Sequence, residues 1–188
     1  MSENTQQYIG RMLSYVEGKD ALRVQRGTAA RLRKLTRGLS RKQLSWKPEP
    51  AKWSIGEIVA HLADTEIVAS WRLRSVLTSN GTTIVPFDQD VWASVFQYDK
   101  RDAKRSLDLF QVLRESNLEL LGGIPSESWD NYGMHTERGK ETVAHLTRMF
   151  AGHDVNHLLQ IEKIAARWNE PRLRKSRAKK GGSRKRRK

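Results

Sequence analysis

Along most of this chain, hydrophobic residues recur at every third or fourth position, with polar residues between them. Such spacing gives an α-helix one apolar face, whereas a half-buried strand would alternate, and no stretch shows convincing alternation. We therefore predict a short N-terminal helical segment and four long helices, over residues 8–16, 20–39, 54–77, 102–121 and 141–168. Four helices of this kind bury their apolar faces against one another, which predicts an all-α four-helix bundle.

The start of the second long helix carries the most complete signal in the sequence. Ser54 can cap the helix, and Glu57 three residues later completes a capping box. Trp53 and Ile58 stand at the two positions of a hydrophobic staple. These residues predict a helix that begins at residue 54.

A long crossover, residues 82–100, joins the second and third helices. It contains a proline but also several large apolar residues, so we expect it to pack over the bundle. Its length permits the second and third helices to run parallel. We expect one domain, the four-helix bundle, over residues 1–170 and a basic, disordered tail over residues 171–188.

The net charge of +14 is concentrated in this tail. From Pro171, which would end a helix, the tail holds 11 of the 35 Lys and Arg residues and no acid, leaving 24 basic against 21 acidic residues elsewhere. A segment so charged and so poor in apolar groups is expected to be disordered. It would bind polyanions non-specifically, since it has no aromatic residue for base stacking, or it would serve as a solubilising appendage.

The composition narrows the class of protein further. With 37% hydrophobic and 30% charged residues, the chain is globular in composition and has no apolar run long enough for a membrane span. Its first residues lack the pattern of a secretory signal, and it contains no cysteine. A disulfide framework, a thiolate metal site and a cysteine nucleophile are therefore excluded, and a cytoplasmic protein is expected.

Two of the five histidines, His153 and His157, lie four residues apart in the last helix. They share one face, and that face is otherwise apolar, so both imidazoles would be buried and would need partners such as a divalent metal. His61, on the inward face of the second helix, could complete a three-histidine site with positions open to water or substrate. The alternative is hydrogen-bonded core histidines. His135 and His145 are expected to be structural or solvent-facing.

Three ordered sequence blocks resemble the DinB-like superfamily of metal-binding four-helix bundles. They are KWSIGEIVAHLADTE at 52–66, PFDQD at 86–90 and GHDVNHLLQI at 152–161, with Arg114 and GKET at 139–142 between them. The resemblance covers about residues 21–168. It implies that His61, His153 and His157 bind a divalent ion such as nickel, zinc or iron, and three imidazoles also accept manganese. Relatives include bacillithiol transferases and mycothiol-dependent maleylpyruvate isomerases, whose cosubstrates are low-molecular-weight thiols.

The resemblance supports the site more strongly than any one reaction. We expect a divalent-metal-dependent enzyme, either a transferase that uses a low-molecular-weight thiol or a hydrolase, acting on a small molecule. Because the chain has no cysteine, a thiol would arrive with a cosubstrate, and the metal would lower the pKa of a bound thiol or water. The alternatives are a non-catalytic metal-binding or stress-related module and a nucleic-acid-associated protein acting through its basic tail.

Four acidic residues are candidates for acid–base or supporting roles, namely Asp64, Glu66, Asp88 and Asp154. Asp88 is the preferred catalytic candidate, because an acid beside Phe87 in an apolar crossover could roof the pocket. Its alternative is turn formation after Pro86. Asp154 would point about 100° away from its neighbour His153 around the helix, which makes direct participation less favourable.

Two residues of the third helix, Arg114 and Asn117, could face the pocket and hold an anionic substrate, although a solvated face explains Arg114 equally well. A homodimer is also compatible with the apolar helix faces. The sequence does not separate core from interface positions for three of the tryptophans, Trp71, Trp92 and Trp168.

Overall fold

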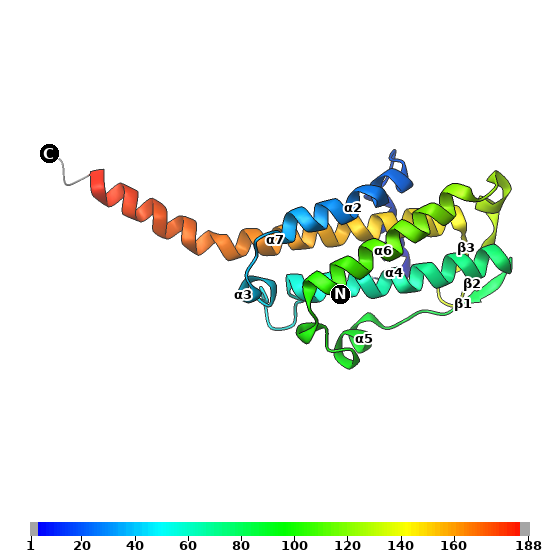
Figure 1. The fold of residues 1–188 in the computed structure, drawn as a ribbon, viewed down its shortest axis with the longest axis horizontal. Coiled ribbons are helices and arrows are strands. Elements are labelled where there is room, and N and C mark those ends of the chain that lie inside the picture. The colour runs from blue at the N-terminus through cyan, green and yellow to red at the C-terminus, as the bar shows by residue number, and fades with distance from the viewer. Residues whose placement is uncertain (1–3, 185–188) are drawn as a thin grey trace.

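The computed structural model describes residues 4–184, and the side chains up to residue 170. Its long helices are α2 (Ala21–Thr36), α4 (Ile55–Thr78), α6 (Ala103–Gly123) and α7 (Val143–Arg184). They pack along one another as a bundle, so the predicted four-helix architecture is confirmed (Figure 1). The capping box at the start of α4 is present, with Ser54 N–H donating to Oε2 of Glu57 at 2.8 Å and Glu57 N–H donating to Oγ of Ser54 at 3.3 Å.

Helices α4 and α6 run in the same direction, and α2 and α7 run in the opposite one (Figure 1). The crossover between α4 and α6 makes this possible by returning the chain along the outside of the bundle. It carries strand β1 (Thr82–Ile84), helix α5 (Gln89–Val95) and the 3-10 helix η1 (Tyr98–Lys100). The parallel arrangement that the long crossover permits is therefore the one adopted.

A small sheet at one end of the bundle was not predicted. Strand β1 pairs in parallel with β2 (Tyr132–His135), which pairs antiparallel with β3 (Gly139–Thr142). Each strand has only three or four residues, too few to show an alternating pattern. Gly133 lies at the centre of the sheet, where a Cβ would come within 2.6 Å of Cδ1 of Ile84 and force that side chain to shift. The sheet ties the crossover to the segment that leads into α7.

Besides α5 and η1 of the crossover, three short helical segments complete the described fold: α1 (Thr5–Ser14), α3 (Arg41–Leu44) and the 3-10 helix η2 (Ser126–Asp130). Helix α1 packs directly on α7. The contact is closest at Gly152, where a Cβ would lie only 2.0 Å from the backbone oxygen of Met12. Any side chain at this position would push the two helices apart, next to one of the candidate histidines.

The core consists of two apolar clusters with a polar layer between them. One cluster is built around Ile58, Leu62, Phe110 and Ile161, and the other around Leu73, Val76, Leu121 and Leu146. Along α4, α6 and α7, buried polar residues fall between these clusters or at their border: His61, Thr65, Glu66, Arg114, Asn117, Asp154 and His157. Because buried polar groups need partners, this layer is where the bundle's chemistry is concentrated.

The last helix is longer than the sequence predicts. The prediction ended it near Trp168, before Pro171, whereas α7 ends at Arg184. The residues after Pro171 are mostly Lys, Arg and Ala, which are good helix formers. Side chains from residue 171 onward, and residues 185–188 altogether, lie outside the described part of the chain, so the disorder and polyanion binding of the tail stay predictions.

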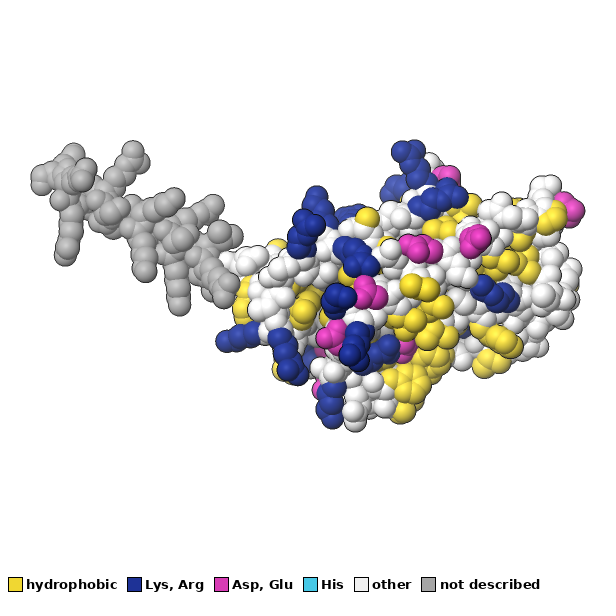
Figure 2. All heavy atoms as spheres, in the orientation of Figure 1, with side chains coloured by type: hydrophobic (Ala, Val, Ile, Leu, Met, Phe, Trp, Pro, Cys, Tyr) yellow, Lys and Arg dark blue, Asp and Glu magenta, His cyan; other side chains and the backbone are white. Residues whose placement is uncertain are grey.

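Within residues 4–184 no helix combines the length and hydropathy that a membrane span requires. The surface of the bundle does expose apolar side chains among charged ones, as one face shows in Figure 2. Trp71 is the most exposed of them, at 74%, whereas Trp168 is half-buried and packs edge-on against Trp46. A homodimer through the exposed apolar residues stays a prediction.

A three-histidine candidate metal centre

The structure brings His61, His153 and His157 together. Nε2 of His153 lies 3.1 Å from Nε2 of His61 and 3.1 Å from Nε2 of His157. The potential ligand atoms of the three residues all lie within 4.8 Å of one another. The convergence expected from the helix faces is thus present, with one residue from α4 and two from α7; we call this group the three-histidine cluster.

Local sequence positions each imidazole. The capping box starts α4 at Ile55, so His61 falls in its second turn on the inward face, where its ring lies 4.8 Å from that of Trp53. His153 follows Gly152, the residue that lets α1 approach α7. The spacing of four residues places His157 one turn further along the same face of α7.

Burial keeps these imidazoles uncharged. It lowers the pKa of His61 and of His153 well below the usual value, and the neighbouring histidines lower both further. Burial also lowers the pKa of His157 to about 4, although its bond with Gln160 works in the opposite direction. At neutral pH all three rings are therefore neutral, which is the form that binds metal ions.

The geometry fits a divalent cation. Metal–nitrogen bonds of about 2.0–2.1 Å, separated by about 90–110°, would place ligand nitrogens roughly 3.0–3.4 Å apart. The Nε2 distances of 3.1 Å fall in this range. On the outer side of His157, Nδ1 lies 3.0 Å from Oε1 of Gln160, a contact that orients the ring. By contrast, Nδ1 of His61 and of His153 is buried with no hydrogen-bond partner among the described residues.

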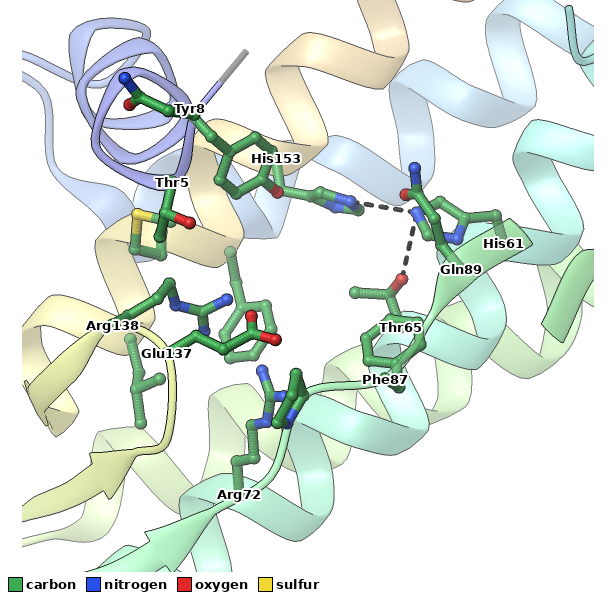
Figure 3. A pocket seen from close by; sticks show the side chains of 15 residues that line it. Thr5, Tyr8, His61, Thr65, Arg72, Phe87, Gln89, Glu137, Arg138 and His153 are labelled. Atoms are coloured by element: carbon green, nitrogen blue, oxygen red, sulfur yellow. Dashed lines mark hydrogen bonds between the residues drawn. The ribbon is translucent and has the colours of Figure 1, made fainter. Parts of the chain in front are cut away.

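A cavity of about 330 Å³ opens beside the cluster. His61 and His153 form part of its wall, and the hydroxyl of Thr65 lies 3.4 Å from Nε2 of His61. Figure 3 shows Arg72, Glu137 and Arg138 reaching into the same cavity from the side opposite the histidines. The metal ligands therefore border a space of small-molecule size that also contains charged groups.

The acidic residues proposed from the sequence lie elsewhere. Asp64 is buried and accepts a hydrogen bond from Nη1 of Arg101 at 2.7 Å. Asp88 is exposed and caps α5, with Oδ1 accepting from the N–H groups of Asp90 and Val91 at 2.9 and 3.0 Å. This is the turn-forming alternative, and Asp88 is not among the residues that line the cavity. A catalytic role for Asp88 stays a prediction without support from its contacts.

Arg114 neither faces the cavity nor lies on a solvated face, so both interpretations of this residue are wrong. It is 2% exposed and bridges two carboxylates, donating to Glu66 at 2.7 and 3.0 Å and to Asp154 at 2.5 and 3.1 Å. Asn117 donates to Glu66 at 2.8 Å, and Thr28 donates to Asp154 at 2.9 Å. We call these five residues the Arg114 cluster. The expected direction of Asp154, away from the metal ligands, is confirmed.

The two remaining histidines stay outside the three-histidine cluster. His135 is buried, and its Nδ1 accepts from the N–H of Glu137 at 3.2 Å. His145 is half-buried, 3.9 Å from a carboxylate oxygen of Glu141. Their predicted structural role agrees with these contacts.

Sequence reasoning missed several residues of the cavity. Thr65 and Arg72 follow His61 by four and eleven residues, a spacing that puts all three on one face of α4 and could have identified them. Glu137 and Arg138 come from the turn between β2 and β3, and no pattern in the sequence marks that turn as part of the site. Only the fold places it there.

Comparisons with known proteins agree with this architecture. The DinB superfamily model matches residues 26–161. Two proteins of Oceanobacillus iheyensis, which are named as inferred metal-dependent hydrolases, are similar in sequence. One is 26% identical over 129 residues, covering 69% of this chain and 74% of the relative. The other is 29% identical over 136 residues, covering 72% and 77%.

A solved structure shows the same fold. YfiT from Bacillus subtilis matches with a TM-score of 0.75. It is described as an inferred metal-dependent hydrolase with an unusual four-helix bundle topology. The match covers 90% of this chain and 91% of YfiT at 20% sequence identity. At this identity the likeness shows the fold.

Proposed function

Because the chain belongs to the DinB superfamily, we propose that it is a metal-dependent hydrolase with a divalent ion on His61, His153 and His157. The observation that carries this proposal is the convergence of three neutral imidazoles, with Nε2 of His153 3.1 Å from Nε2 of each of the other two, beside a cavity whose wall includes His61 and His153. The names of the relatives from Oceanobacillus iheyensis support the same class of reaction. The substrate is a small molecule, since the cavity measures about 330 Å³.

The contacts around the three-histidine cluster indicate what each part of the site would contribute to hydrolysis. A divalent ion held by the three imidazoles would lower the pKa of a bound water molecule toward neutrality and would polarise an oxygen of the substrate. The hydroxyl of Thr65 lies 3.4 Å from Nε2 of His61, so it could hydrogen-bond an oxygen atom of a molecule bound next to this nitrogen. The rings of Trp53 and Phe87 lie 4.8 and 6.5 Å from that of His61 and limit the access of bulk water.

The proposal is tested by metal content together with hydrolysis. Tag-free protein is loaded with nickel, zinc, iron or manganese, analysed for bound metal, and assayed with a panel of small esters and amides. We expect about one ion per chain and metal-dependent hydrolysis in the wild type, and loss of both in His61→Ala and His153→Ala. The matched control is His145→Ala, which removes a half-buried histidine of α7 outside the cluster and should retain metal and activity.

Adding low-molecular-weight thiols to the same assay separates hydrolysis from transfer. A thioether or thioester product that forms only with the thiol would assign the protein to the transferases instead. If the wild type binds none of the four metals, or if both histidine variants bind as much as the wild type, the proposed metal centre is wrong.

A further inference from the structure

Arg72 differs from Arg114, the other buried arginine among the described side chains, and from the half-buried Arg101 and Arg138. Arg114, Arg101 and Arg138 each donate to a carboxylate at 3.1 Å or less. Arg72 is 7% exposed, yet among the side chains described, those of residues 4–170, no carboxylate lies within 4.0 Å of it. Its one hydrogen bond within this part of the chain runs from Nη2 to the backbone oxygen of Val85, at 2.8 Å. A buried guanidinium normally has an anionic partner, because isolating its charge is costly.

The guanidinium of Arg72 carries its charge at neutral pH. Burial lowers the pKa of Arg72 to about 10, the positive charge of Arg138 contributes to the shift, and the more distant carboxylate of Glu141 works in the opposite direction. The hydrogen bond to Val85 uses one of the five N–H donors of the group, and the residue lines the cavity beside His61 and His153. Figure 3 shows Arg72 reaching into this cavity on the side away from the two histidines.

We propose that Arg72 binds an oxyanion of the substrate, a carboxylate or a phosphate-type group, at the opposite end of the cavity from the metal centre. Arg138 would add a second positive charge there, although its Nε and Nη2 already donate to Glu141 at 2.7 and 3.1 Å. The inference rests on the proposed function, because the reacting group of the same substrate would lie at the three-histidine cluster. A planar guanidinium suits this task because two parallel N–H groups match the two oxygens of an oxyanion.

Helix geometry sets the length of the substrate. Arg72 follows His61 by eleven residues on the same face of α4, which separates their Cα atoms by about 16 Å along the helix axis. The arginine side chain leans back toward the N-terminal end of the helix, so its guanidinium lies on the order of 10 Å from the imidazole. The substrate is therefore an elongated molecule with the anionic group several bonds away from the bond that is hydrolysed.

Glu137 is the acid that shares this cavity. It is exposed, and Figure 3 shows it beside Arg138 in the turn between β2 and β3. Its carboxylate is farther than ion-pair distance from Arg72, so it weakens the positive potential without occupying the guanidinium. Replacing Glu137 by Gln should therefore tighten the binding of an anionic ligand while leaving a neutral ligand unaffected.

The test uses three hydroxamates that differ only at the far end of an eight-carbon chain. The hydroxamate group chelates a bound divalent metal, and the far end is a carboxylate, a phosphonate or the uncharged methyl ester. Dissociation constants are measured by calorimetry on zinc-loaded wild type, Arg72→Gln, Arg72→Lys and Glu137→Gln. Arg105→Gln, an exposed arginine of α6, is the matched control.

In the wild type we expect the carboxylate or the phosphonate to bind roughly 10–100-fold more tightly than the ester, as charge-assisted hydrogen bonds would give. Whichever anion gains more identifies the kind of oxyanion. Arg72→Gln should remove this advantage but keep the affinity for the ester, which reports an intact metal centre. Arg72→Lys should retain part of it, Glu137→Gln should increase it, and Arg105→Gln should leave it unchanged.

Equal binding of the ester and both anions by the wild type overturns the oxyanion site while leaving the metal centre intact. The same conclusion follows if Arg72→Gln keeps the full advantage. Failure of even the ester to bind metal-treated wild-type protein overturns the metal centre, and this proposal with it.

Discussion

In the Arg114 cluster every charged group has several partners, whereas the three-histidine cluster keeps buried nitrogens that have no hydrogen-bond partner among the described residues. Both lie in the polar layer between the two apolar clusters, and His153 and Asp154 are neighbours on α7. Arg114 donates four hydrogen bonds to two carboxylates, and each of these carboxylates has a further donor, Asn117 or Thr28. Nδ1 of His61 and of His153 has no such partner.

The difference separates a polar group that holds the fold from one that is arranged for a ligand. A buried charge network with all its hydrogen bonds made is costly to disturb and has no capacity left for a substrate. A group of neutral, incompletely bonded imidazoles next to a cavity is costly to keep, which makes a ligand-binding role the better explanation. The same reasoning distinguishes Arg114, with its two carboxylates, from Arg72, with none.

The largest expected effect on stability comes from removing the centre of the satisfied cluster. Arg114→Met would leave Glu66 and Asp154 buried without their cation, and such a change costs about 3–5 kcal/mol. Urea unfolding measures the loss. Arg105→Met, an exposed site on the same helix, should stay within about 0.5 kcal/mol of the wild type. A loss below about 1 kcal/mol for Arg114→Met would contradict the structural role of the cluster.

The pH dependence of the metal-free protein should report the three-histidine cluster. The pKa of His157 is about 4 in the folded protein, against about 6.5 for an unperturbed histidine. Between these values the unfolded chain binds more protons, so stability is complete above about pH 6.5 and falls as the pH drops toward 4. The lowered pKa values of His61 and His153 act in the same direction.

For His157 alone this loss amounts to roughly 3 kcal/mol. It is measured by urea unfolding in the presence of a chelator at a series of pH values, with wild type and His157→Asn compared at each. The variant should lose less stability on acidification. Identical slopes for the two proteins would show that His157 is not buried as a neutral ring.

A smaller effect is expected from the residue that orients His157. With a metal on Nε2, the Nδ1–H of His157 would donate a hydrogen bond to Oε1 of Gln160, the 3.0 Å contact in the structure. Losing such a partner weakens metal binding by about 10–100-fold. Competition with a chelator of known affinity should show this loss in Gln160→Leu. Gln160→Glu keeps the acceptor and should retain the affinity, and equal affinities for the two variants would exclude the orienting role.

Several of these features could be read from the sequence because they depend on near neighbours along the chain. Ser54 and Glu57 form their capping box within four residues. The spacing of His153 and His157 places them on one face of any helix that contains them, and their apolar neighbours turn that face inward. The bundle and the inward direction of His61 follow from this periodicity, and the convergence of the three imidazoles was inferred from it together with the resemblance to the DinB-like superfamily.

Other features were decided by contacts between distant segments. Arg114 is a charged residue that satisfies a helical pattern equally well facing water or facing a cavity, and only Glu66 and Asp154, from two other helices, place it in the core. Strand β1 forms because residues some fifty positions later pair with it. The turn with Glu137 and Arg138 reaches the cavity for the same reason.

The sequence by itself therefore determined the helices, the inward faces and the three histidines, because helix periodicity and capping act over a few residues. Only the tertiary structure decided which buried charged groups form ion pairs and which have no opposite charge within ion-pair distance. That decision depends on where oppositely charged side chains from different helices end, and at Arg72 the fold brings none within ion-pair distance among the residues described.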